Sequence, residues 1–105
     1  MNRFSTEKGE SQLRVFFKSF GPIRRVAGAS VIELDVSESS TIQDVIQKAI
    51  ELLGKQLSHL IMTDGKVSGN LILLLNGRDT QRLDGLNTIV SENDEITILP
   101  HVQGG

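Results

Sequence analysis

Hydrophobic and polar positions alternate along three stretches of the chain, as they do in β-strands with one buried face. The stretches are residues 13–19, 30–36 and 95–99, and apolar side chains fall at every second position in each. Phe16 and Leu99 are additional apolar residues on the opposite faces of the first and last stretches. The breaker Phe20-Gly21-Pro22 and one helical turn over residues 23–26 separate the first two stretches. This spacing predicts that the first two strands form an antiparallel hairpin.

Residues 42–53 follow a different period and predict the main helix. Thr41 is a candidate N-cap, Asp44 three residues later completes a variant of the capping box, and Gly54 is the expected stop. One face of this segment is apolar at helical spacing and the other is polar. The apolar positions are Ile42, Val45, Ile46, Ala49, Ile50 and Leu53. An amphipathic helix of this length needs one apolar surface to cover, and a small sheet supplies it.

The second half of the chain adds shorter elements. Residues 55–63 predict a helical turn with Leu57, Leu60 and Ile61 facing inward, ended by a turn at residues 64–65. Five apolar residues at 71–75 run up to Asn76-Gly77 and predict a strand with both faces covered or used. A small extra strand is expected near residues 66–69 or near residue 83. The order β-β-α-β-β predicts an α+β fold, with a mixed four- or five-stranded sheet packed on one main helix.

Length and composition fit one small domain with a protein partner. The chain has 105 residues, a net charge of −2 and no cysteine, which excludes disulfides, thiolate metal sites and a cysteine nucleophile. Charges are dispersed, so neither nucleic acid nor an anionic membrane is an expected partner. Because no apolar run reaches membrane-spanning length, we expect a soluble cytoplasmic protein. We divide the chain into a disordered lead at 1–12, a domain at 13–100 and a flexible tail at 101–105.

The tail, His101-Val102-Gln103-Gly104-Gly105, is the candidate reactive segment. It follows Pro100, which ends the last strand, and five extended residues reach about 16 Å. Because glycine lacks a Cβ, the end of the tail fits a channel too narrow for other residues. A processed or engineered Gly-Gly end is the alternative. His59 has no second ligand at metal spacing, and the chain lacks both a phosphate-binding loop and a set of nucleophile, base and orienting residue.

The residues described so far resemble a known family, the ubiquitin-like sulfur carriers of the β-grasp fold. The chain resembles especially the small subunit of molybdopterin synthase and the archaeal small modifiers. It covers residues 13–105 and rests on segments 16–17, 24–29, 41–42, 75–78, 93–96 and 99–105. Family members commonly end in Pro-Pro-Val-x-Gly-Gly, and this chain has His101 in place of the second proline. The lead at 1–12 has no counterpart in the minimal family pattern.

The resemblance implies that the carboxylate of Gly105 is the reactive group and that Gly104 accompanies it. A separate adenylating enzyme would activate Gly105 with ATP and Mg²⁺, and sulfur delivered to the adenylate would leave a C-terminal thiocarboxylate. The chain itself would bind no cofactor and no metal, and would act as a carrier rather than as an enzyme. The sulfur acceptor would be a molybdopterin precursor, bound by the large subunit of molybdopterin synthase, or tRNA.

Two other functions remain open on the sequence. In the first, the activated Gly105 is joined to lysines of target proteins, as in ubiquitin-like modifiers. In the second, the chain is a non-reactive interaction domain and its Gly-Gly end is incidental.

The sequence also predicts a partner-binding surface. Phe16 and Leu99 point away from the predicted core, and together with one parity of residues 71–75 they would form an apolar patch near the tail. Pro100 and Val102 would lie along the path of the tail, and Arg78 would add a basic rim. The alternative is that a loop or the lead covers these side chains.

Overall fold

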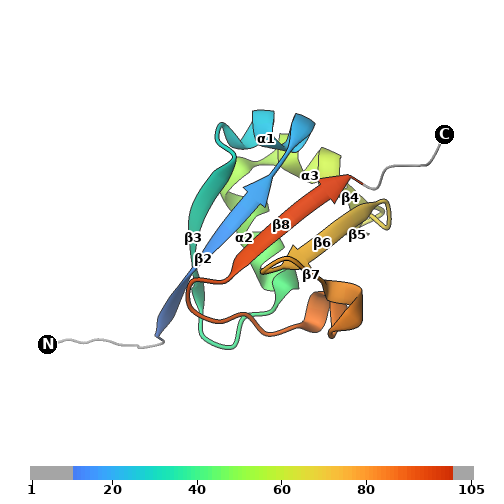
Figure 1. The fold of residues 1–105 in the computed structure, drawn as a ribbon. Helices are drawn as coiled ribbons and strands as arrows, with labels where there is room; N and C mark the ends of the chain where they lie inside the picture. Colours follow the sequence, from blue (N-terminus) through green and yellow to red (C-terminus); the bar gives the residue numbers. More distant parts are fainter. Residues whose placement is uncertain (1–10, 101–105) are drawn as a thin grey trace, which may run out of the picture.

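The computed structural model describes residues 11–100. Five strands form one mixed sheet in the order β3-β2-β8-β6-β7 (Figure 1). A mixed sheet of four or five strands was predicted, but its fifth strand lies at residues 78–79, whereas the strand expected near residues 66–69 belongs to a separate hairpin. A separate two-stranded hairpin pairs β4 with β5. The strands are β2 (Gln12–Ser19), β3 (Val31–Ser37), β4 (Met62–Thr63), β5 (Lys66–Val67), β6 (Leu71–Leu75), β7 (Arg78–Asp79) and β8 (Glu95–Pro100). Strand β2 begins at Gln12, the last residue of the segment that we expected to be the lead.

Strand β8 is the central strand of the sheet. It pairs in parallel with β2 on one edge and antiparallel with β6 on the other. Strands β2 and β3 form the predicted antiparallel hairpin, with Phe17 opposite Ile32. The first and last long strands are therefore neighbours, and the chain leaves the sheet at Pro100 from a strand that is paired on both edges.

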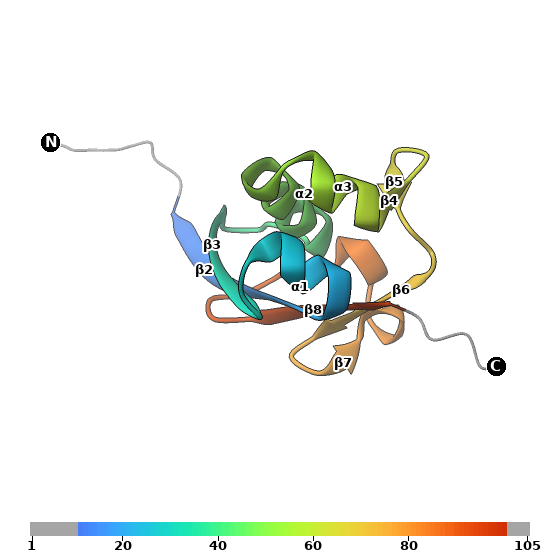
Figure 2. The ribbon, with the colours of Figure 1, turned by 90° about the horizontal axis from the view of Figure 1, so that it is seen from above.

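All three helices lie on one side of the sheet (Figure 2). They are α1 (Gly21–Ala27), α2 (Ile42–Leu53) and α3 (Lys55–Ile61), and two short 3₁₀ helices follow, η1 (Thr80–Arg82) and η2 (Gly85–Asn87). The segment predicted as a breaker is the start of α1, because Pro22 lies in its first turn, where a missing N–H costs no hydrogen bond. In α2 the predicted capping box is present: Thr41 Oγ1 accepts from the Asp44 N–H, and the Thr41 N–H donates to the Asp44 carboxylate.

The core lies between the inner face of the sheet and the helices. Strand positions that alternate toward the helices are buried, as is the predicted apolar face of α2, where Ile46 is 1% exposed. The prediction for α3 is partly wrong, since Leu57 and Ile61 are buried whereas Leu60 is 39% exposed. The buried apolar residues are Val15, Phe17, Ile23, Leu34, Val36, Ile42, Val45, Ile46, Ala49, Leu57, Ile61, Leu73, Leu75, Val90, Ile96 and Ile98.

A hydrogen-bonded cluster fixes the end of the sheet opposite Pro100. Asn76 and Gly77 both have positive φ angles, 51° and 86°, as a tight two-residue hairpin turn between β6 and β7 requires. The Asn76 side chain donates to Asp94 Oδ1 at 2.9 Å and accepts from the Glu95 N–H at 2.8 Å. The Asn76 N–H donates to the Glu95 carbonyl at 2.8 Å. These bonds set the register in which β8 enters the sheet between β2 and β6.

Candidate docking face beside the C-terminal strand

The face of the sheet turned away from the helices carries a group of apolar side chains. In Figure 2 the helices cover the opposite face. The strand registers place Phe16, Val31, Ile72, Leu74 and Leu99 on this outer face, because their positions alternate along the strands with those of residues directed into the core. We refer to the following residues as the outer-face patch: Phe16, Phe20, Val31, Ile72, Leu74 and Leu99.

The outer-face patch is centred on β8. Leu99 is paired with Ile72, and Thr97 lies between Lys18 of β2 and Leu74 of β6. Thr97 is only 6% exposed although it faces away from the helices, because side chains on both neighbouring strands flank it. Side chains are therefore closely packed at the centre of the patch. The patch continues along β8 to Leu99, which lies two residues before the start of the tail.

Phe20 extends the patch beyond the end of β2. Its ring lies 5.7 Å from the Lys18 Nζ, close enough for a cation–π contact, and Lys18 is on the outer face opposite Val31. Phe20 and Val31 are 39% and 40% exposed. The sequence interpretation did not include either residue, because Phe20 belonged to a predicted breaker and Val31 to the polar side of its strand. Extending the parity of β2 to Phe20 would have identified the first of them.

Charged residues bound the patch on the side of β3. Arg14 Nε and Glu33 Oε2 form a solvent-exposed ion pair at 3.1 Å across β2 and β3. Asp35, paired with Arg14, is also exposed. Charged residues are common at the solvated periphery of an interface. We therefore expect β3 to lie at the periphery and the apolar residues of β8 and β6 to lie nearer the centre of an interface.

The structure brings together some of the predicted site residues. Phe16 and Leu99 both belong to the outer-face patch, and Pro100 follows Leu99 at the end of β8. Arg78 lies elsewhere: it is opposite Leu75, at the end of β6 that is far from the Leu71–Pro100 pair, and on the side of the sheet to which Leu75 points. Val102, Gly104 and Gly105 lie outside the described residues.

Residues 11–100 contain no cluster of three or more His, Cys, Asp or Glu side chains that could hold a metal ion. Within the same range, no helix combines the length and apolar character needed to cross a membrane. His59 is exposed on α3, and it lines a shallow depression with Pro22, Arg25 and Leu60. The outer-face patch is the candidate site that lies beside the end of β8, where the chain continues into the tail.

The arrangement of strands defines the class of protein. A mixed sheet whose first and last long strands lie side by side in parallel, with the main helix packed on one face, is the ubiquitin-like β-grasp fold. The ThiS family model matches residues 18–105, so this chain belongs to the ThiS family. The predicted fold class and family are both confirmed.

Three proteins illustrate the relationship. A predicted sulfur carrier protein of Archaeoglobus fulgidus is 34% identical over 74 residues, which are 70% of this chain and 83% of that protein. Small archaeal modifier protein 3 of Haloferax volcanii is 33% identical over 96 residues, 91% of this chain and 99% of that one. The solution structure of small archaeal modifier protein 1 from Methanosarcina acetivorans has a TM-score of 0.78 at 29% identity, covering 90% and 99% of the two chains. The chain is thus of the type that comprises sulfur carriers and small archaeal modifiers.

Proposed function

We propose that this protein is a sulfur carrier whose C-terminal carboxylate, on Gly105, is converted to a thiocarboxylate. The carboxylate oxygen attacks the α-phosphate of ATP on a separate adenylating enzyme, which forms the acyl-adenylate and releases pyrophosphate. Hydrosulfide then attacks the carbonyl carbon, the C–O bond to AMP breaks, and AMP leaves with the original oxygen. The first step is required because a carboxylate has no leaving group better than oxide.

The observation that carries the proposal is the position of β8. This strand is paired on both edges and ends at Pro100 beside the outer-face patch. The sequence continues from there to Gly104 and Gly105. A rigid strand that leads directly into a short segment ending in two glycines is suited to deliver a carboxylate into a narrow active site of another protein.

The adenylating enzyme is the partner that we assign to the outer-face patch. An enzyme that covers Leu99 and Ile72 would be positioned to receive the residues after Pro100. The patch combines apolar side chains with charged residues along the β3 side, as protein-binding surfaces commonly do. ATP and Mg²⁺ belong to the partner, because the charge that develops on the phosphates during adenylation must be stabilised by cationic groups there. This chain acts as the substrate and carries no cofactor of its own.

The acceptor of the sulfur is proposed to be a molybdopterin precursor on the large subunit of a molybdopterin synthase, or tRNA. A second function uses the same activated carboxylate: conjugation of Gly105 to lysines of target proteins. The 33% identity to small archaeal modifier protein 3 favours keeping this alternative. Both functions require adenylation, and they differ only in the nucleophile that attacks the adenylate.

The proposal is tested by the intact mass of the full chain. The protein is incubated with ATP, Mg²⁺, a cognate adenylating enzyme and sulfide, and a chain lacking Gly105 serves as the control. We expect a mass gain equal to replacement of one oxygen by sulfur, absent from the control. The deletion should leave the melting temperature unchanged, because Gly105 follows the folded strand β8 by several residues.

The other outcomes separate the alternatives. Formation of the adenylate without a thiocarboxylate, together with appearance of lysine conjugates in the presence of target proteins, would favour the modifier function. If a competent enzyme adenylates another carrier but not this chain, the carrier and modifier functions are both wrong. A loss of thermal stability in the Gly105-deleted chain would contradict the assumption that the terminal glycine is separate from the core.

A further inference from the structure

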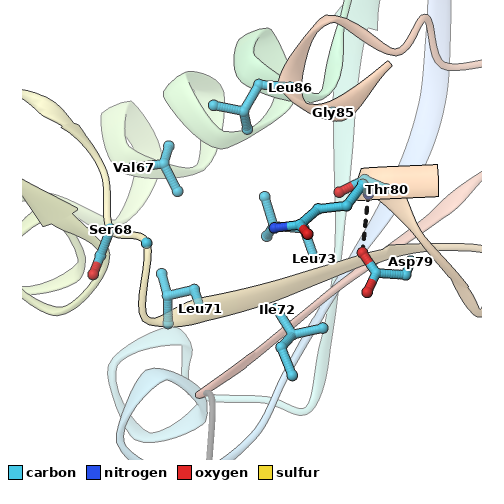
Figure 3. Close-up of a pocket in the computed structure, with 11 residues that line it drawn as sticks. Val67, Ser68, Leu71, Ile72, Leu73, Asp79, Thr80, Gly85 and Leu86 are labelled. Atoms are coloured by element: carbon cyan, nitrogen blue, oxygen red, sulfur yellow. Dashed lines mark hydrogen bonds between the residues drawn. The ribbon is translucent and has the colours of Figure 1, made fainter. Parts of the chain in front are cut away.

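A second surface feature lies at the other edge of β6. It shares Ile72 with the outer-face patch, and its other lining residues lie outside that patch. It is a cavity of about 470 Å³ between β6, the β4–β5 hairpin and the two 3₁₀ helices. Figure 3 shows Val67, Leu71 and Leu86 around this space, with Asp79 and Thr80 at one end. The volume falls in the range of pockets that bind small ligands or one to two peptide side chains.

The backbone of β6 along this cavity has no strand partner on the cavity side. Strand β7 is only two residues long and pairs with Leu74 and Leu75. Within the described chain, residues 71–73 are paired as a strand only with β8. Strand β7 ends because the chain turns away into η1 at Thr80. The edge of the sheet is therefore open over three residues, directly beside the cavity.

The hydrogen-bond pattern shows which backbone groups face this edge. The Asn76 N–H donates to the Glu95 carbonyl on β8. In an antiparallel ladder the residues that bond to a given neighbour alternate, so Leu74 and Ile72 bond toward β8, whereas Leu73 and Leu71 direct their N–H and C=O groups the other way. The Leu71 N–H already donates to the Ser68 carbonyl at 3.3 Å. The Leu73 N–H and the Leu71 carbonyl are thus directed to the open edge.

We propose that the open edge of β6 and the adjoining cavity form a groove that binds an extended peptide of a partner protein. The peptide adds a strand beside residues 71–73 through main-chain hydrogen bonds, as in other cases of strand addition. Alternate side chains of an added strand point to the helix side of the sheet. These side chains enter the cavity and pack against Val67, Leu71 and Leu86, so the peptide carries apolar residues at those positions.

The charge of the cavity indicates which residues the peptide carries. Of the described residues that line the cavity, Asp79 is the only charged one, and its Oδ1 accepts a hydrogen bond from the Gln81 N–H at 2.9 Å, which holds the carboxylate in place. A basic residue in the peptide is therefore favoured opposite Asp79. The terminal carboxylate of this chain's own tail is disfavoured there, because it would lie against a like charge.

The test uses the full chain and a displayed library of random peptides of about seven residues, close to the length of a typical strand. We expect enrichment of peptides with apolar residues at alternate positions and a basic residue. Titration of an enriched peptide should shift the backbone amide resonances of residues 67–73 and 79–86, and should slow hydrogen exchange of the Leu73 amide by about tenfold or more at saturation. The same peptide binding is expected for the chain that lacks Gly105. A negative result in the peptide experiment is therefore independent of whether the protein is a sulfur carrier.

Three substitutions sharpen the test. Gly69→Trp places a large side chain at a residue that lines the cavity, where a Cβ meets no atom within 4 Å, and should weaken binding by about tenfold or more. Gln47→Trp, on the exposed side of α2, is the matched control and should leave binding unchanged. Asp79→Asn keeps an oxygen for the Gln81 N–H and should weaken binding of peptides with a basic residue by about two- to fivefold.

Three results would overturn the proposal. In the first, the library yields no enriched sequence. In the second, the resonances shifted by enriched peptides are those of Phe16, Phe20, Val31 and Leu99, which lie away from the cavity. Alternatively, the unliganded chain is a dimer in solution that Gly69→Trp converts to a monomer, in which case the open edge of β6 binds a second copy of this chain instead of a partner peptide.

Discussion

Both faces of strand β8 carry apolar residues, but the residues on the two faces have different roles. Ile96 and Ile98 point to the helices and are fully buried. Leu99 points the other way and is only half-buried, although it is as apolar as the other two. Burial on the inner face stabilises the fold, whereas an apolar residue on the outer face contributes little to the monomer and is available to a partner. Burial, rather than hydrophobicity, therefore separates residues that hold this fold together from residues that can bind.

The largest effect on stability is expected on the inner face. Truncation of Ile98 or Ile46 to alanine should lower the free energy of unfolding by about 2–5 kcal/mol, because each leaves a cavity among side chains that cannot fully collapse. Chemical denaturation of both variants measures it. A cost below about 1 kcal/mol for Ile98→Ala would mean that the two faces of β8 differ less than their exposures indicate.

A smaller effect is expected at the exposed turn residue Asn76, at the hydrogen-bonded end of the sheet. Asn76→Ala removes the bonds to Asp94 and Glu95 and forces alanine into a positive φ of 51°. We expect a loss of about 1–3 kcal/mol in the free energy of unfolding. Asn70→Ala, an exposed asparagine in a loop, is the control and should change stability by less than about 0.5 kcal/mol. Equal effects in the two variants would contradict a structural role for the Asn76 cluster.

On the outer face the expected effect is on binding. Leu99→Ala should raise the KM for adenylation by about tenfold, the loss typical of one central interface residue, and should lower stability by less than about 1 kcal/mol. The control is Leu52→Ala on α2, which removes an apolar residue that is 63% exposed on the helix side. An unchanged KM for Leu99→Ala, or an equal rise for Leu52→Ala, would show that the partner does not use the outer-face patch.

The smallest effect is expected at the one polar position of β2 that points inward. Ser19 is fully buried, and its hydroxyl has no hydrogen-bond partner among the described residues. Because a buried hydroxyl without a partner is unfavourable, Ser19→Ala should leave stability unchanged or raise it by up to about 1 kcal/mol. Thermal denaturation measures the change. A clear loss of stability would mean that the hydroxyl is satisfied in solution, by a water molecule or by a movement of the backbone.

The sequence was sufficient to predict the elements in which the pattern of apolar and polar residues continues over many positions. Strands β2, β3 and β8 alternate over five residues or more, and α2 combines an apolar face with the capping box at Thr41. Phe16 and Leu99 were assigned correctly to the face opposite the core, because their neighbours Phe17 and Ile98 fixed the parity. The adjacency of the first and last strands came from the family resemblance, since no local pattern specifies a parallel pairing between residues about 80 positions apart.

The same reasoning did not predict the short elements. Strand β7 and the 3₁₀ helix η1 together span residues 78–82, too few for a periodic signal, and the cavity beside β6 exists because the chain turns away there. Leu60 was expected inside because its spacing from Leu57 fits a helix, but α3 is only seven residues long and buries a narrow stripe. Phe20 was treated as part of a breaker, although the contact with Lys18 places it beside the outer face.

The central position of β8 also has a mechanical consequence. A pull on the segment after Pro100 acts along β8, which is bonded to β2 on one edge and to β6 on the other. A force in that direction loads the hydrogen bonds of both ladders together in shear, so no single bond can be opened first, as it would be if the strand were peeled from an edge. The domain can therefore resist tension applied through its own C-terminal strand. A partner that binds and pulls the end of the chain acts against both ladders of β8 at once.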